Sequence, residues 1–530
     1  MTKAFARLRL AALATTLALG VASAAHAETV LNRGNGAEPE TLDPHKSTGI
    51  PEANIIYDYL EGLVTYDVNG EITPGVATSW DISDDGLTYV FHLREDSKWS
   101  NGDPVTAEDF VYSLRRAVDP VTASDYAPVL APINNAEDII AGKVPPDQLG
   151  VEAVDAHTLK VTLNGPTPYF IGLVRHHIAY PVHRATVEKF GDQWTRPGNA
   201  VGNGAYTIAE WTPQASVTLV KNPTFHDAAN VKIDKIVFYP TEDIAEELKR
   251  FRAGELDITY DVPSDQIKWA EQNMPNELHN TPYFGTYYYV VNLTREPLSD
   301  VRLRKALALA IDRETLTEKI TQGGELPGYS WVPPGIPGYT PQYASFKDMT
   351  QEQRNEEAKK LLAEAGYGPD KPLEIELLYN TSDNHKKIAV AIAAMWKQVL
   401  GVKANPVNQE WKVYLETRDQ KQYQIARAGW IGDYVDAVNF LDLFISTAGE
   451  RNDAGYNNAK YDDLLKQAAQ TSDLAARSKL LEEAEHIFLE DLPLIPIYTY
   501  TTQHMISQKV EGWKDNVLDF HLARYMSIKG

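Results

Sequence analysis

The chain contains no cysteine. This absence excludes disulfide bonds, thiolate catalysis and cysteine-ligated metal sites. It also excludes a lipid anchor attached to an N-terminal cysteine. A chain of 530 residues without cross-links must be stabilised by its hydrophobic core, and its length suggests roughly two to four structural units.

Long apolar runs are absent beyond the first residues. A positively charged start is followed by the apolar run Leu10–Val21 and by the small-residue sequence Ala25-His26-Ala27, which is typical of a cleaved signal peptide over residues 1–27. This run is too short for a transmembrane helix, and no later stretch approaches about eighteen consecutive apolar residues. We therefore expect an exported, soluble protein that begins near Glu28.

Basic residues are scarce. The sequence has 50 lysines and arginines against 73 aspartates and glutamates, a net charge of −23. Residues 1–27 hold three of the basic residues and none of the acidic ones, so the remainder has a net charge of −26. Because nucleic acids and anionic membrane surfaces are bound by basic patches, we predict neither as a partner.

Common catalytic motifs are also absent. The sequence has no G-x-S-x-G, H-E-x-x-H, phosphate-binding or dinucleotide-binding motif. His176, His177 and His183 do not share one face of a helix or strand, which argues against a metal site. We predict a protein without enzymatic activity, metal or cofactor. A secreted hydrolase is the alternative from a different class, and an assay of peptide cleavage would distinguish the two.

The stretch Asn408–Tyr434 concentrates aromatic and charged side chains. Trp411 and Arg418 are seven residues apart, so on a helix they share one face. Residues 423–428 alternate in polarity and predict a short strand that contains Arg427. An arginine can bind a carboxylate, and an indole can pack against the apolar part of a ligand.

A predicted turn follows that strand. Gly429 and Gly432 flank Trp430, and glycines allow a tight turn or the close approach of a ligand. Asp433 comes directly after them and could bind an ammonium group. Taken alone, a tryptophan on a helix face is more often part of the core, and an arginine–aspartate pair is usually a surface ion pair.

Two further segments have a clear local structure. In Ala77–Arg116, the turn Asp84-Asp85-Gly86 joins two alternating strands, and Thr106 begins an amphipathic helix with acidic residues in its first turn. Thr29–Gly34 predicts an opening strand, which is followed by the sequence Leu42-Asp43-Pro44-His45. We interpret the segment Ala77–Arg116 as structural.

These sequences, together with EWKVYLETR and ARAGWIGDY in the stretch Asn408–Tyr434, resemble the periplasmic oligopeptide-binding proteins of peptide ABC transporters, which are family 5 extracellular solute-binding proteins. The resemblance covers essentially the whole chain after residue 27. It implies an α/β, two-lobed periplasmic binding protein fold with mixed sheets, a hinge and an additional third domain (type II, cluster C).

The resemblance also divides the chain into domains. Domain I is discontinuous and comprises residues 28–61, 186–284 and 502–530. Domain II, the additional domain, comprises residues 62–185, and domain III comprises residues 285–501. Domains I and III are the expected ligand-binding lobes.

By this resemblance the chain is a receptor in the periplasm of a Gram-negative bacterium. It would capture short oligopeptides of about two to five residues, with broad tolerance of side chains. A monomer would then deliver the peptide to an inner-membrane ABC permease. A murein tripeptide or dipeptide receptor of the same fold is the alternative, since murein peptide also has a free α-amino group.

The resemblance further implies the ligand contacts. Asp433 would bind the α-ammonium group, Arg427, Arg418 and His385 the carboxylate, and Trp411 and Trp430 would shape side-chain pockets. The other residues expected in the groove are Gly429, Tyr126, Tyr288, Tyr500, Thr48 and Ile50.

This chain departs from its relatives at several positions of the groove. Several close relatives have an acidic residue in place of Thr48 and a lysine in place of Thr321. Some have cysteines in place of both Gly285 and Ile431, so the expected structure must manage without that cross-link.

Overall fold

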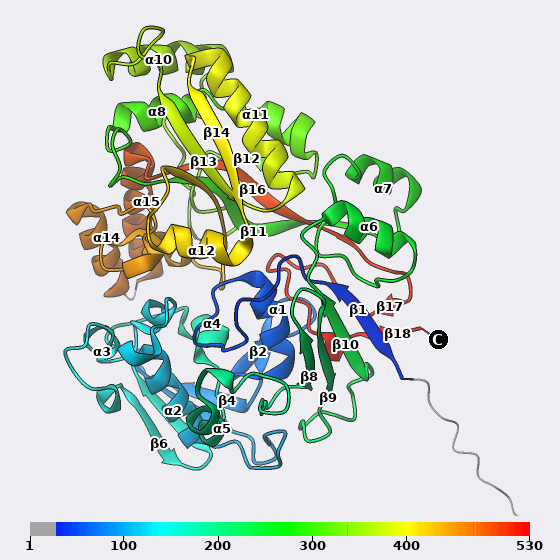
Figure 1. The fold of residues 1–530 in the computed structure, drawn as a ribbon. Coiled ribbons are helices and arrows are strands. Elements are labelled where there is room, and N and C mark those ends of the chain that lie inside the picture. The colour runs from blue at the N-terminus through cyan, green and yellow to red at the C-terminus, as the bar shows by residue number, and fades with distance from the viewer. Residues whose placement is uncertain (1–27, 337, 472, 530) are drawn as a thin grey trace, which may run out of the picture.

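The computed structural model describes residues 28–529 except 337 and 472, so the predicted signal peptide lies outside the described residues. Two lobes are connected by the long strands β11 (Leu278–Val291) and β16 (Leu494–Met505), which run side by side between them (Figure 1). In the part of the chain described, no helix is long and apolar enough to cross a membrane.

The first lobe contains two four-stranded sheets. One has the order β1-β10-β9-β8, formed by Val30–Gly34, Lys235–Tyr239, Ser216–Lys221 and Tyr206–Thr212. The other has the order β4-β5-β7-β6, formed by Ala77–Ile82, Thr88–Leu93, Thr158–Thr162 and Val151–Asp155. One continuous core joins both sheets with α1 (Ile50–Tyr59) and α2 (Ala107–Val118), so predicted domains I and II share an interior.

The predicted hairpin and helix of Ala77–Arg116 are confirmed. Strands β4 and β5 pair in antiparallel fashion, and α2 begins after Thr106. The main-chain N–H of Thr106 donates to Asp109 Oδ2 at 2.7 Å, which satisfies a donor at the start of the helix. Asp109, one of the two acids of the first turn, therefore forms a capping box with Thr106.

The second lobe is built on a mixed six-stranded sheet of order β12-β16-β11-β15-β13-β14. Besides β11 and β16, its strands are β12 (Leu326–Pro327), β15 (Ile425–Ile431), β13 (Glu374–Asn380) and β14 (Lys403–Gln409). The core on this sheet includes residues of α8 (Val301–Leu309), α10 (Gln351–Glu364) and α11 (Asp383–Leu400). Antiparallel β11 and parallel β13 both pair with β15, which makes the sheet mixed.

The segment around Trp430 differs from its prediction. Helix α12 (Trp411–Asp419) forms where expected, but β15 continues through Gly429 and Trp430 instead of turning there. The reason is its neighbour: β11 pairs with β15 from Gly285↔Ile431 to Val291↔Ile425 and satisfies its main-chain groups. At Gly285 an added Cβ would collide with Ile431, so packing replaces the cross-link expected in some relatives.

Candidate ligand-binding site

Two adjoining cavities lie between the lobes, with volumes of about 260 and 80 Å³. Ile50 of α1, Tyr283 of β11 and Asp519 of the C-terminal segment line both of them, so they form one groove. The larger cavity also contacts Arg427 of β15, and the smaller one contacts Asp433 just after that strand. One short segment therefore contributes a charge to each cavity.

Arg427 gives the larger cavity a positive charge. Its Nη1 donates to Asn380 Oδ1 at 3.1 Å, and its Nη2 donates to the Tyr500 hydroxyl at 2.6 Å. The guanidinium also lies 4.7 Å from the ring centroid of Tyr287. Burial lowers the pKa of Arg427, but Tyr500 and Tyr287 outweigh it and raise the pKa, so the group stays charged. No carboxylate of residues 28–529 forms an ion pair with it.

The N-terminus of α11 lies at the same cavity. Thr381, Ser382 and His385 line the cavity there, and the positive end of a helix dipole favours an anion. Burial, with a contribution from Arg427, lowers the pKa of His385 well below its ordinary value, so its ring is neutral. Arg427 and this helix end together offer a binding site for a carboxylate.

Asp433 gives the smaller cavity a negative charge. Its main-chain N–H donates to Asn439 Oδ1 at 3.1 Å, and its carbonyl oxygen accepts from Arg175 Nη2 at 2.8 Å. Oδ2 of its carboxylate has no hydrogen-bond partner among the described residues. Burial raises the pKa of Asp433, although Arg175 and His177 oppose the increase. A buried carboxylate with a free oxygen is suited to bind an ammonium group.

The ring of His176 faces this carboxylate. The Ile178 N–H donates to His176 Nδ1 at 3.2 Å, so the single ring proton lies on Nε2. Nε2 is 3.4 Å from Asp433 Oδ1. Burial and the nearby charge of Arg175 lower the pKa of His176 well below its ordinary value. The imidazole is therefore neutral and leaves the negative charge of Asp433 available to a ligand.

Aromatic rings from both lobes stack beside the smaller cavity. The Tyr126 ring stacks on His176 with centroids 4.9 Å apart, and its centroid lies 6.2 Å from that of Trp430. Tyr126 belongs to the first lobe and Trp430 to β15 of the second. This stack therefore forms only when the lobes are close together.

The structure brings most of the predicted site residues to the groove. The smaller cavity is lined by Thr48, Ile50, Tyr126 and Asp433, and the larger one by Ile50, His385, Trp411, Arg427, Gly429 and Tyr500.

Arg418, Tyr288 and Trp430 line neither cavity. Arg418 forms an ion pair with the buried carboxylate of Asp453, so its charge is already matched. Tyr288 is buried in the core, where its ring meets Trp331 at a centroid distance of 4.7 Å. Trp430 lies behind Tyr126 and donates from Nε1 to Asn439 Oδ1 at 3.0 Å. The ligand contacts predicted for these three residues therefore remain predictions, since none of them lines either cavity.

Sequence reasoning missed Arg175, His176 and His177 as neighbours of Asp433. The spacing of the histidines in the sequence was used only as an argument against a metal site. In the structure, the imidazoles of His176 and His177 line the smaller cavity. A signal was present: three consecutive polar residues interrupt an apolar segment, and all three are buried. Buried polar residues of this kind need a specific partner.

Two lobes that enclose a groove and are joined by a pair of strands define a class of proteins that bind a ligand between the lobes. The chain belongs to the bacterial extracellular solute-binding proteins, family 5, whose model matches residues 71–452. The two-lobed α/β fold with mixed sheets that the sequence predicts is confirmed by solved structures of this family.

Named relatives cover nearly the whole chain. The periplasmic oligopeptide-binding protein OppA of Salmonella typhimurium is 44% identical over 94% of this chain and 92% of its own length. The periplasmic murein peptide-binding protein MppA of Escherichia coli is also 44% identical, over 93% and 91%. The structure of Haemophilus influenzae OppA in complex with the peptide RPPGFSPFR has a TM-score of 0.93 at 39% identity, and covers 95% of this chain and 100% of that one.

Two MppA structures show which arrangement of the lobes this chain has. One Escherichia coli structure gives a TM-score of 0.93, whereas the unliganded open form gives 0.67, both at 43% identity and 95% coverage of this chain. They cover 99% and 98% of the matched chains. Because the sequences match equally well, the difference lies in the arrangement of the lobes. The present structure is not the open form.

Proposed function

We propose that this protein is a periplasmic receptor that encloses short oligopeptides between its lobes and delivers them to an ABC importer. The observation that carries this proposal is the pair of charges at the two cavities. Arg427 lines the larger cavity and Asp433 the smaller one, and neither charge is matched by an ion pair with a permanently charged group of the described chain. A free-ended peptide carries the complementary charges at its two termini.

The separation of the two groups suits a short peptide. Arg427 and Ile431 are four residues apart in a strand, which corresponds to roughly 13 Å, and Asp433 follows two residues later. An extended peptide of about three to five residues has a comparable length. We propose that Asp433 binds the α-ammonium group and that Arg427, with the α11 N-terminus, binds the carboxylate.

The groove side of β15 also offers main-chain hydrogen bonds. Strand β13 pairs with β15 only at Ile425 and Ala426, so the edge from Arg427 to Ile431 has no neighbouring strand on that side within the described sheet. Arg427, Gly429 and Ile431 line the larger cavity. An extended peptide can add to such an edge through its own main chain, which supports binding without selection of side chains.

The substitution Asp433→Asn tests this proposal. It keeps the shape of the side chain but removes the charge that binds the ammonium group. We expect the affinity for trialanine to fall by roughly 3 kcal/mol, as when one partner of a buried charge pair is removed. Calorimetry on protein unfolded, dialysed free of carried peptide and refolded measures this loss. Asp227→Asn, at an exposed site outside both cavities, is the matched control. Unchanged affinity in Asp433→Asn would remove the ammonium assignment.

Murein peptide is a second candidate ligand, because MppA matches this chain as well as OppA does. Comparing murein tripeptide with trialanine by calorimetry separates the two. Location in the periplasm, partnership with a permease and a monomeric state remain parts of this proposal. We propose no catalytic step, so the bound peptide should be recovered uncleaved.

A further inference from the structure

Arg451 lies where the two lobes meet beside the smaller cavity. It ends the short helical turn Gly449–Arg451 in the second lobe, and Asp453, two residues later, is held there by its ion pair with Arg418 of α12. Arg451 itself lines neither cavity. Any effect of its side chain on a ligand in the groove must therefore be transmitted through its neighbours.

The guanidinium of Arg451 lies against aromatic rings from both lobes. Its central carbon is 5.6 Å from the ring centroid of Trp430, in β15 of the same lobe, and 5.4 Å from that of Tyr126 in the first lobe. The centroids of the two rings are 6.2 Å apart, and the rings are inclined by only 23°. The three groups form a nearly equilateral triangle, so one cation contacts both rings across the boundary between the lobes.

The aromatic rings are the principal partners of this guanidinium. Its Nε is buried without a hydrogen-bond partner among the described residues, and no carboxylate of residues 28–529 forms an ion pair with it. A cation is attracted by the negative face of an aromatic ring, and the attraction is stronger where water is excluded. Because Tyr126 is buried, its ring offers such a water-poor face.

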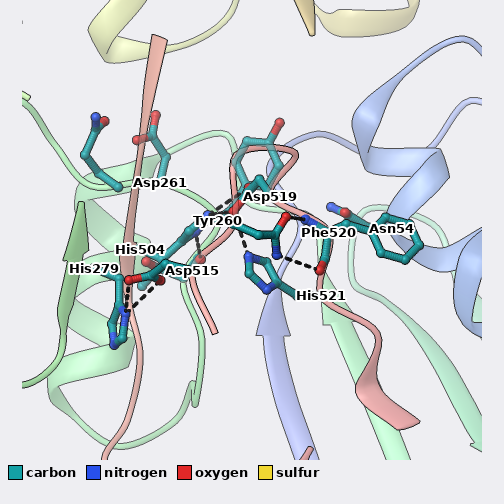
Figure 2. Close-up of polar contacts among 12 residues, drawn as sticks. Asn54, Tyr260, Asp261, His279, His504, Asp515, Asp519, Phe520 and His521 are labelled. Atoms are coloured by element: carbon teal, nitrogen blue, oxygen red, sulfur yellow. Dashed lines mark hydrogen bonds and ion pairs between the residues drawn. The ribbon is translucent and has the colours of Figure 1, made fainter. Parts of the chain in front are cut away.

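The charged cluster around Asp519 shows the contrast. Asp519 Oδ2 lies 3.0 Å from His504 Nε2, and its Oδ1 lies 2.9 Å from His521 Nε2 (Figure 2). All three residues belong to the C-terminal part of the chain, which packs on the first lobe, so closure is not needed to assemble this network. Arg451 differs, because it shares a lobe with Trp430 and meets Tyr126 only when the lobes are close together.

We propose that Arg451 is a positioning residue that holds the lobes closed over a bound peptide through its contact with Tyr126. This inference rests on the proposed function and adds to it a residue outside the groove. Trp430 keeps the guanidinium in place, and closure supplies Tyr126 as its second ring. Because the closed lobes enclose the groove, a peptide leaves only after this contact has been broken.

The substitution Arg451→Gln tests the inference on refolded, peptide-free protein. We expect the affinity for trialanine, measured by calorimetry, to fall about tenfold, or about 1.4 kcal/mol. The loss should come from faster dissociation, measured by stopped-flow fluorescence, since the contact exists only in the closed arrangement. Tetraalanine should lose affinity by the same factor, because Arg451 contacts neither end of the peptide.

Arg196→Gln is the matched control. Arg196 lies 4.3 Å from the ring centroid of Trp211, and both residues belong to the first lobe and line neither cavity. This contact does not cross between the lobes, so its removal should leave the affinity unchanged. Arg451→Lys keeps the cation and should recover part of the lost affinity, which loss of side-chain packing alone would not predict.

The variant Tyr126→Leu removes the ring through which Arg451 acts. In this background Arg451→Gln should cost less than about threefold in affinity, because the cross-lobe partner is already absent. The alternative route is charge: burial raises the pKa of Asp433, and Arg451 is one of the nearby groups that oppose the increase. A loss that acted through Asp433 would persist in the Tyr126→Leu background.

Unchanged affinity for trialanine in Arg451→Gln, or a loss that persists undiminished in the Tyr126→Leu background, would overturn the inference. Either result leaves the proposed function intact, because the parent protein still binds trialanine. If the parent protein does not bind trialanine, the proposed function itself fails and the inference fails with it.

Discussion

The guanidinium groups of Arg427 and Arg418 differ in their partners within the protein. Arg427 donates to the neutral oxygens of Asn380 and Tyr500, whereas Arg418 is paired with the buried carboxylate of Asp453. An anion from the ligand can therefore gain from Arg427 without breaking an ion pair. Arg418 would first have to give up Asp453.

This difference predicts opposite effects of one substitution at the two positions. Arg427→Gln should weaken binding of trialanine by roughly 2 kcal/mol, because the peptide carboxylate loses a charged donor. Its effect on trialanine amide should be small. Arg418→Gln should instead lower the free energy of unfolding by roughly 3 kcal/mol, since Asp453 is left buried without its cation. Calorimetry measures the affinity, and urea denaturation measures the free energy of unfolding. A loss of affinity in Arg418→Gln that equals the loss in Arg427→Gln would contradict this assignment.

At the scale of single elements, the path of β15 determines what the groove presents. Gly429 lies inside the strand, opposite Tyr287, and an added Cβ would collide with the Tyr500 hydroxyl and lie 3.2 Å from Arg427 Nη2. The glycine is thus required by the close approach of Tyr500. That approach in turn positions Arg427.

Gly429→Ala should therefore weaken binding while the fold is retained. Displacing Tyr500 breaks its hydrogen bond to Arg427, and we expect affinity for trialanine to fall about tenfold, or about 1.4 kcal/mol. Gly368→Ala is the control, because nothing lies within 4 Å of the added Cβ there. For both variants, calorimetry measures the affinity for trialanine and circular dichroism checks that the fold is retained. Unaltered affinity in Gly429→Ala would show that Tyr500 does not position Arg427.

The histidine of β16 makes stability depend on pH. His504 Nδ1 lies 3.0 Å from the Thr259 carbonyl oxygen and Nε2 lies 3.0 Å from Asp519 Oδ2, so both nitrogens face acceptors and both carry protons. Burial opposes this charge, but Asp519 outweighs it and raises the pKa of His504. A raised pKa in the folded state stabilises the protein below the unfolded value of about 6.5. This contribution is lost as the pH rises through the folded pKa.

We therefore expect His504→Gln to lower the free energy of unfolding by roughly 3 kcal/mol at pH 6 and by less at pH 8. The contribution of Asp519 to stability depends on pH in the opposite direction. Because the pKa of Asp519 is lowered in the folded state, its contribution is present above the unfolded pKa and is lost only in acid. Urea denaturation at both pH values measures the difference. An equal loss at pH 6 and pH 8 would mean that His504 is uncharged in the folded protein.

The sequence predicts helices and strands that depend on neighbouring residues well. It predicts poorly which charged side chains remain available to a ligand. The spacing of Trp411 and Arg418 predicts α12 correctly, because a helix depends on neighbouring residues. The predicted turn at Gly429 is wrong, because β15 pairs with β11, which is distant in the chain, and therefore continues as a strand through Gly429. The surroundings of Asp433 were equally inaccessible, since Arg175 contacts it from 258 positions away. Whether a charge is available to a ligand depends on such distant partners.

At the scale of the whole molecule, contacts between the lobes accompany the enclosed groove. Besides Tyr126 against Trp430, the Ser264 N–H donates to Asn384 Oδ1 at 3.1 Å across the lobes. Strands β11 and β16 pass between the lobes and connect them (Figure 1). The lower TM-score against the open form of MppA indicates that related chains also adopt a more separated arrangement.

Peptide should therefore shift this protein from a more extended to a more compact arrangement. Small-angle scattering should give a larger radius of gyration for refolded, peptide-free protein than for protein saturated with trialanine. At the same peptide concentration the Asp433→Asn variant should remain extended, because its weaker affinity leaves most of the protein without bound peptide. An identical radius with and without peptide would show that the lobes do not move.

The central claim is that the groove binds a peptide by its free amino terminus, and one calorimetric comparison tests it most directly. Refolded protein is titrated with trialanine and then with trialanine whose amino end is acetylated. The account predicts tight binding of the free peptide and a loss of roughly 3 kcal/mol for the acetylated one, which leaves Asp433 enclosed without its partner. Equal binding of both peptides would contradict the account.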